Sequence, residues 1–72
     1  MKKIYRIKNL QCAHCAHKME KSIQKLDGIE NASVNFLMQK ITIETSVENL
    51  TELEKEISKI CKKIESDCEV IL

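Results

Sequence analysis

The chain has 72 residues, of which 43% are hydrophobic and 32% are charged, and its formal net charge at pH 7 is +1. This length suits one small domain, residues 1–72, and the charge gives no general attraction to nucleic acid or to an anionic membrane. Tyr5 and Phe36 are its only Phe, Tyr or Trp residues, too few to stack the bases of single-stranded nucleic acid. No apolar run approaches the roughly 18 residues of a membrane span. We therefore expect a cytoplasmic monomer with no nucleic-acid partner.

The first predicted elements are a strand and a helix. Residues 4–8 alternate, with Tyr5 and Ile7 on one side, which is typical of a half-buried strand. Over residues 15–26 the apolar positions recur at helical spacing and predict a helix with one apolar face. Gly28 then suits the left-handed conformation that commonly follows a helix end.

The second half of the chain predicts a hairpin, a helix and a strand. Residues 32–36 and 40–44 are two alternating runs joined by a short segment, which favours a β-hairpin. The second helix is expected to begin at Thr51, with Glu54 three residues later completing a capping box. Residues 68–72 form the last predicted strand. The inward-facing positions of the second helix are Leu53, Ile57, Ile60, Cys61 and Ile64.

The predicted order βαββαβ corresponds to a known small architecture. Two right-handed βαβ crossovers with a hairpin between them give a four-stranded antiparallel sheet with both helices on one face. This is the α+β ferredoxin-like sandwich. Its first strand-to-helix loop would carry Cys12 and Cys15.

Cys12 and Cys15, separated by two residues, are the strongest chemical signal in the sequence. Thiolate is the ligand form of cysteine, and two thiolates at this spacing can converge on one soft metal ion without closing a long loop. At a helix start, the helix dipole and free N–H groups favour thiolate, which we expect to lower the pKa at Cys15. Cys12 and Cys15 are therefore the predicted metal ligands.

Three segments also carry a family resemblance: Asn-Leu-Gln-Cys-Ala-His-Cys-Ala at 9–16, Leu-Asp-Gly-Ile at 26–29 and Ala-Ser-Val-Asn-Phe at 32–36. Together they resemble the heavy-metal-associated domain. That family includes cytoplasmic copper chaperones, periplasmic mercury-binding proteins and amino-terminal domains of P-type ATPases that export copper, zinc, cadmium or lead. The resemblance implies that Cys12 and Cys15 take the ion and that the domain alone catalyses nothing.

The end of the chain bears on which metal is bound. Residues 62–70 resemble the tail of the zinc, cadmium and lead exporter branch, in which a carboxylate-bearing loop faces the metal loop. Cu(I) is content with two or three sulfurs, whereas Zn(II) and Cd(II) seek about four ligands and accept oxygen. Glu65, Asp67 and Cys68 are therefore candidate additional ligands, and we expect Zn(II), Cd(II) or Pb(II) to be favoured over Cu(I).

The resulting prediction is a carrier of a soft metal ion. By resemblance it is the cytoplasmic amino-terminal domain of a zinc, cadmium or lead exporting P-type ATPase. Its partners would then be the membrane and ATP-hydrolysing domains of that parent, or a protein that donates or accepts the metal. The runner-up is a free-standing Cu(I) chaperone.

Two further alternatives use the cysteines differently. The Cys-x-x-Cys pair at a helix start is also the layout of thiol-disulfide oxidoreductases, but this chain has no proline and a different element order. A structural zinc site on all four cysteines is opposed by the six residues between Cys61 and Cys68, which exceed the spacing of compact zinc sites. Cys61 is instead expected to be a small buried hydrophobe.

Overall fold

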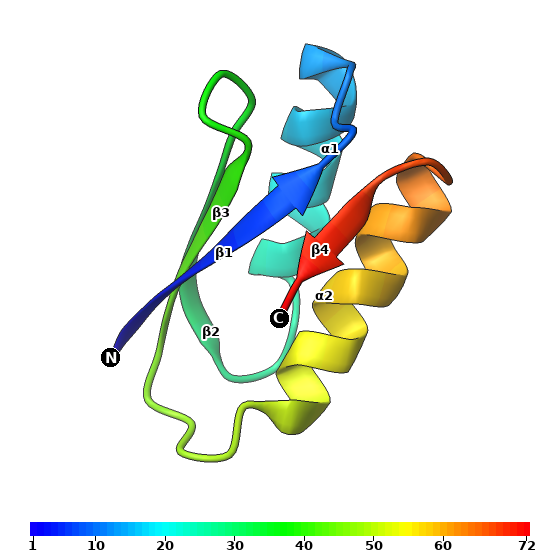
Figure 1. The fold of residues 1–72 in the computed structure, drawn as a ribbon. Coiled ribbons are helices and arrows are strands. Elements are labelled where there is room, and N and C mark those ends of the chain that lie inside the picture. The colour runs from blue at the N-terminus through cyan, green and yellow to red at the C-terminus, as the bar shows by residue number, and fades with distance from the viewer.

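The computed structural model describes residues 1–72 and contains four strands and two helices. Their order is β1 (Lys2–Lys8), α1 (Ala13–Gln24), β2 (Ile29–Asn35), β3 (Lys40–Thr45), α2 (Thr51–Ile64) and β4 (Glu69–Ile71). The strands form one antiparallel sheet in the order β2-β3-β1-β4. Both helices cover the same face of this sheet (Figure 1). The predicted ferredoxin-like βαββαβ fold is confirmed.

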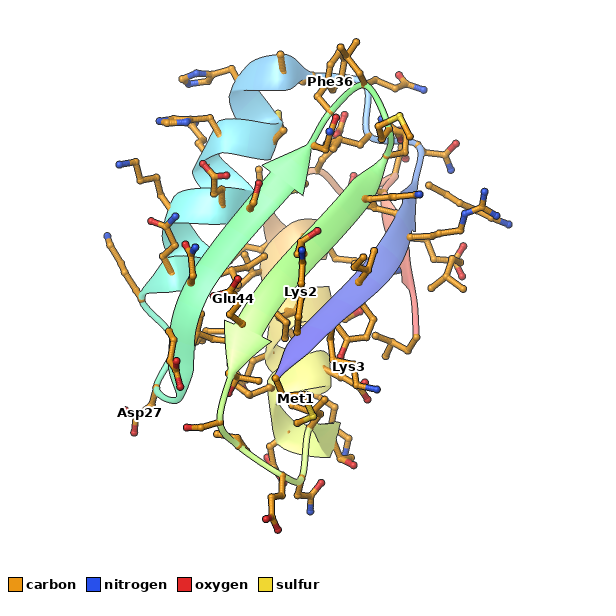
Figure 2. The ribbon with its side chains drawn as sticks, turned by 90° about the vertical axis from the view of Figure 1, so that its left-hand side faces the viewer. Met1, Lys2, Lys3, Asp27, Phe36 and Glu44 are labelled. Atoms are coloured by element: carbon orange, nitrogen blue, oxygen red, sulfur yellow. The ribbon has the colours of Figure 1, made fainter.

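One hydrophobic core fills the space between the sheet and the helices. On β1, Tyr5 and Ile7 are buried as their alternation predicts, whereas Ile4, which precedes Tyr5, is exposed. Figure 2 looks onto the sheet face that no helix covers, where the paired positions Lys2 and Glu44 lie exposed. Neither helix combines the length and apolar character that crossing a membrane would require. The fully buried members of the core are Ile7, Met19, Ile23, Ile41, Ile43, Thr45, Ile57, Cys61 and Cys68.

Helix α1 begins two residues before the predicted start at Cys15. Cys12 has an extended backbone and is the N-cap, and its Sγ accepts the N–H of Cys15 at 3.2 Å. The apolar stripe used for the prediction begins only at Cys15, so the first turn of the helix had no hydrophobic signal. Beyond the helix, Gly28 has a φ of +92° in the turn that leads into β2, which is the left-handed conformation predicted for it.

The predicted hairpin is present and extends further than its hydrophobic pattern indicates. Strand β2 begins at Ile29 instead of residue 32, and its register with β3 shifts between Ile29 and Asn31. A bulge of this kind breaks the two-residue alternation that identifies a strand from sequence. The turn between β2 and β3 ends at Gln39, whose φ is 54°.

The predicted capping box at the start of α2 is wrong. Leu50 is the N-cap and makes no side-chain hydrogen bond there, and the N–H of Thr51 instead donates to Asn49 Oδ1 at 3.1 Å. Glu54 does not turn back to the helix start because it accepts the hydroxyl of buried Tyr5 at 2.9 Å. At the chain end, β4 covers Glu69–Ile71, shorter than the predicted residues 68–72, with Val70 in the core.

Candidate metal site

The two predicted ligands lie at one end of the molecule, where three connecting segments meet. These are the β1–α1 loop that carries Cys12, the β2–β3 turn and the α2–β4 segment, which lie near one another in Figure 1. Hydrogen bonds join the first of them to both others: the Leu10 N–H donates to Gln39 Oε1 at 3.0 Å, and Asn9 Nδ2 donates to the Asp67 carbonyl at 3.2 Å. The fold thus brings residues from distant parts of the chain to the cysteine loop.

Cys12 and Cys15 face each other across the first turn of α1, and both side chains are partly exposed. The N-cap position places the Cys12 sulfur beside the unpaired N–H groups and the positive end of the helix dipole. Hydrogen bonds from the Cys15 thiol and then from the Cys15 N–H lower the pKa of Cys12. Sharing the same thiol proton raises the pKa of Cys15, with desolvation as the next cause.

The helix start therefore acts on the first cysteine of the pair. We expected a lowered pKa at Cys15, and the structure places the lowered value at Cys12 because that residue, outside the first turn, is the one that accepts hydrogen bonds. A pair in which one thiol ionises readily and the other keeps its proton presents one ready nucleophile. Cys12 is thus the thiol of the pair that ionises more readily.

Glu65 is the carboxylate that the fold brings nearest to this loop. It is the C-cap of α2, and its Oε2 accepts the backbone N–H of Gln11 at 3.4 Å. Its negative charge makes a smaller contribution than the hydrogen bonds to the pKa of Cys12 and Cys15, and this contribution raises both values. Asp67 approaches the loop through its carbonyl oxygen, which accepts the amide of Asn9, and the residue is exposed.

Cys68 lies below the surface and forms no ligand group with Cys12 and Cys15. Its side chain is 1% exposed, and its Sγ donates to the Cys61 carbonyl at 3.5 Å. Burial raises the pKa of both thiols, that of Cys61 to about 12. Cys61 is fully buried, as expected of a cysteine that packs as a hydrophobe. Both sulfurs therefore stay protonated inside the core at neutral pH.

No three His, Cys, Asp or Glu side chains form a group ready to hold one metal ion. The two thiols with Glu65 beside them are the nearest approach to such a group. A third protein ligand would require a side-chain movement of Glu65 or Asp67, or a group supplied from outside. The arrangement therefore offers two sulfur ligands and leaves further coordination positions open.

Two residues at this end of the molecule were not found from the sequence. Asn9 and Gln39 hold the cysteine loop from opposite sides through their side-chain amides. Asparagine is enriched among left-handed residues, which is a weak signal for Asn9. Gln39 carries no local signal, since its partner Leu10 is 29 residues away.

Comparison with known proteins finds matches in sequence and in fold. A family model described as the heavy-metal-associated domain matches residues 4–68. A protein of Alkalihalophilus pseudofirmus named a probable cadmium-transporting ATPase is 43% identical over 53 residues, which cover 74% of this chain and 7% of that protein. A copper-exporting P-type ATPase of Bacillus subtilis is 32% identical over 60 residues, which cover 81% of this chain and 8% of that protein.

A solved structure shows the same fold at moderate sequence similarity. It is the Cu(I)-loaded solution structure of the N-terminal domain of a potential copper-translocating P-type ATPase from Bacillus subtilis. That structure has a TM-score of 0.75 and 27% identity, and the match covers 99% of this chain and 84% of that one. The two ATPases above are far longer than this chain, which spans only 7–8% of their length.

Proposed function

Because the chain belongs to the heavy-metal-associated domain family, we propose that it binds one soft metal ion through Cys12 and Cys15 and passes the ion on by ligand exchange. The observation that carries this proposal is the geometry of the pair. Cys12 is the N-cap of α1 with its sulfur on the Cys15 N–H, and both thiols are partly exposed. Two sulfurs held at a positive helix end and open to solvent suit the capture of a thiophilic cation.

Binding begins at the thiol that ionises more easily. The lowered pKa of Cys12 makes it the first ligand. A cation bound there replaces the proton that Cys15 shares with Cys12, and its positive charge favours ionisation of Cys15 as the second ligand. Binding therefore releases protons and weakens as the pH falls. Both thiols remain open on the solvent side, so that an incoming thiolate can attack the ion before Cys12 or Cys15 leaves it.

Glu65 supports a divalent cargo. Its carboxylate accepts the Gln11 N–H, one residue before Cys12. Its negative charge makes a raising contribution to the pKa of both thiols, which at Cys12 the hydrogen bonds outweigh. Zn(II) and Cd(II) prefer about four ligands in total and accept oxygen among them, whereas Cu(I) is satisfied by two or three sulfurs. We therefore propose Zn(II), Cd(II) or Pb(II) as cargo in preference to Cu(I). Glu65 is the most favourable additional ligand, ahead of exposed Asp67 and buried Cys68.

The biological context follows from the relatives. Identity is 43% to the probable cadmium-transporting ATPase and 32% to the copper-exporting one. This difference supports a place as the cytoplasmic amino-terminal domain of an ATPase that exports divalent ions. The 27% identity to a Cu(I)-loaded domain supports a Cu(I) carrier, free-standing or not, as the second candidate.

Metal competition on the reduced protein tests the proposal. Affinities for Zn(II), Cd(II), Pb(II) and Cu(I) are compared between the wild type and the variants Cys12→Ser and Glu65→Gln. Glu69→Gln serves as a matched control because Glu69 is an exposed carboxylate on β4. We expect Cys12→Ser to weaken the binding of all four ions. Glu65→Gln should weaken only the divalent ions, since its amide oxygen still accepts the Gln11 N–H but coordinates a cation poorly.

Two results would count against the proposal. Unchanged affinities in Cys12→Ser would contradict the metal site itself. A preference for Cu(I) that persists in Glu65→Gln, with no loss of divalent binding, would favour the copper alternative.

A further inference from the structure

Asn9 and Gln39 are the only residues other than glycine with a left-handed backbone, at φ values of 62° and 54°. A side chain makes this conformation unfavourable, so it persists where the surrounding structure compensates for it. Both residues carry a side-chain amide, and both use it to bond a backbone group of another segment. The two unusual backbone positions thus coincide with contacts around the cysteine loop.

The amide of Gln39 holds both polar groups of Leu10. Its Oε1 accepts the Leu10 N–H at 3.0 Å, and its Nε2 donates to the Leu10 carbonyl at 2.8 Å. The same Nε2 donates to the Phe36 carbonyl at 2.8 Å, which ties the amide to its own turn. Both hydrogens of the Nε2 group are therefore used, and the amide is fixed in place. Leu10 is 3% exposed and lies two residues before Cys12, so Gln39 fixes the approach to the first ligand.

Asn9 holds the same loop from the opposite side. Its Nδ2 donates to the carbonyl of Asp67 in the α2–β4 segment, at 3.2 Å. That segment also provides Glu65, whose carboxylate accepts the Gln11 N–H. The residues immediately before Cys12 are therefore bonded to the β2–β3 turn on one side and to the α2–β4 segment on the other.

We propose that Gln39 and Asn9 are positioning residues of the metal site. Their side-chain amides, which we call the amide clamp, hold the β1–α1 loop so that Cys12 occupies the N-cap of α1 before any ion arrives. Ligands that are already in place lose less conformational freedom on binding, which raises affinity and slows release. This inference rests on the proposed function, in which Cys12 and Cys15 are the ligands.

Glycine substitutions distinguish the effect of the side-chain amide from that of the left-handed backbone. Gln39→Gly and Asn9→Gly remove the side chain but retain the left-handed φ, which glycine adopts freely. Leu37→Ala is the matched control because Leu37 lies in the same turn and is 88% exposed. The probe is Cd(II) alone. Its affinity is measured by competition with a chromophoric chelator, and its coordination by the thiolate-to-cadmium charge-transfer absorption. In the metal-free protein, the rate of hydrogen exchange at the Leu10 backbone N–H measures whether the bond to Gln39 is present.

We expect Gln39→Gly to bind Cd(II) about tenfold more weakly, because it loses the three hydrogen bonds that fix the approach to Cys12. Its Leu10 amide should exchange faster, and the Cd(II) absorption should change in intensity. Asn9→Gly should show a smaller loss of affinity, because it removes one hydrogen bond instead of three. Leu37→Ala should match the wild type.

A merely structural role gives a different pattern. It would lower the thermal midpoint of the metal-free variants but leave Cd(II) affinity and absorption unchanged at temperatures where they are fully folded. That result in both glycine variants would overturn the amide clamp. Failure of the proposed function is recognised separately, by Cd(II) affinity that is the same in Cys12→Ser as in the wild type.

Discussion

Cys12 and Cys15 occupy one short loop, yet the fold gives the two thiols opposite changes in proton affinity. Hydrogen bonds from the Cys15 thiol and N–H lower the pKa of Cys12, and sharing that thiol proton raises the pKa of Cys15. The N-cap position creates this difference, because it points one sulfur toward the N–H groups at the helix start. Sequence spacing alone treats the two cysteines as equivalent.

This asymmetry predicts the order in which the four cysteines react. In the reduced, metal-free protein, iodoacetamide should modify Cys12 first because thiolate is the reactive form. Cys15 should react more slowly, and buried Cys61 and Cys68 should react only when the chain unfolds. Site-resolved mass spectrometry over a time course measures this order. In urea the four rates should become similar, and a faster reaction at Cys15 than at Cys12 would contradict the assignment.

The candidate ligands Cys12 and Cys15 could be predicted from sequence because their two-residue spacing is itself the signal. Glu65 could be placed near them only through the family resemblance. Cys68 illustrates the limit of that approach, since the expectation that its segment faces the metal loop did not show that its thiol points to Cys61 inside the core. Gln39 could not be predicted, because its function depends on a hydrogen bond across 29 residues.

Among the elements, existence and order were predictable and several end points were not. Every strand and helix packs one side against the core, and this one-sided burial produces the alternation and the helical spacing of apolar residues in the sequence. End points are decided by individual hydrogen bonds. Cys12 Sγ starts α1 early, and the Tyr5 hydroxyl takes the Glu54 carboxylate that a capping box at Thr51 would need.

The connection from α1 to β2 depends on Gly28, which yields a prediction at this scale. Its φ is +92°, and a Cβ added there would lie 2.7 Å from Val47 Cγ2. Gly28→Ala should therefore destabilise the fold by about 1–3 kcal/mol through backbone strain and this clash. Urea unfolding measures the loss. Adding Val47→Ala to Gly28→Ala should restore only the part of the lost stability that the clash causes, because the strained φ remains.

Equal stability of Gly28→Ala and the wild type would contradict this account of the turn. Gly28→Asn offers a further comparison, since asparagine tolerates the left-handed region better than alanine. Gly28→Asn should carry less backbone strain than Gly28→Ala but keep the clash with Val47. Full recovery of stability when Val47→Ala is added to Gly28→Ala would show that the clash, and not the φ angle, accounts for the loss.

For the whole molecule, the buried acids Cys61 and Tyr5 predict how stability depends on pH. Burial raises the pKa of Cys61 from 9.0 to about 12. Burial, followed by the hydrogen bond to Glu54, raises the pKa of Tyr5 from 10.0 to about 12. A group whose pKa is higher in the folded chain stabilises the fold fully below its unfolded pKa, and this contribution is lost as the pH rises toward the folded value.

The unfolding free energy should therefore decline as the pH rises from about 9 toward 12, while these two groups leave it unchanged near neutrality. Urea unfolding of the reduced, metal-free protein between pH 7 and 11 measures the decline. The double variant Cys61→Ala and Tyr5→Phe will be less stable at every pH because it loses core packing and the bond to Glu54. Its slope above pH 9 should nevertheless be shallower, and a slope equal to that of the wild type would show that other groups control alkaline unfolding. The slope separates proton linkage from packing because the lost packing contacts of the thiol and the hydroxyl shift the whole curve without tilting it.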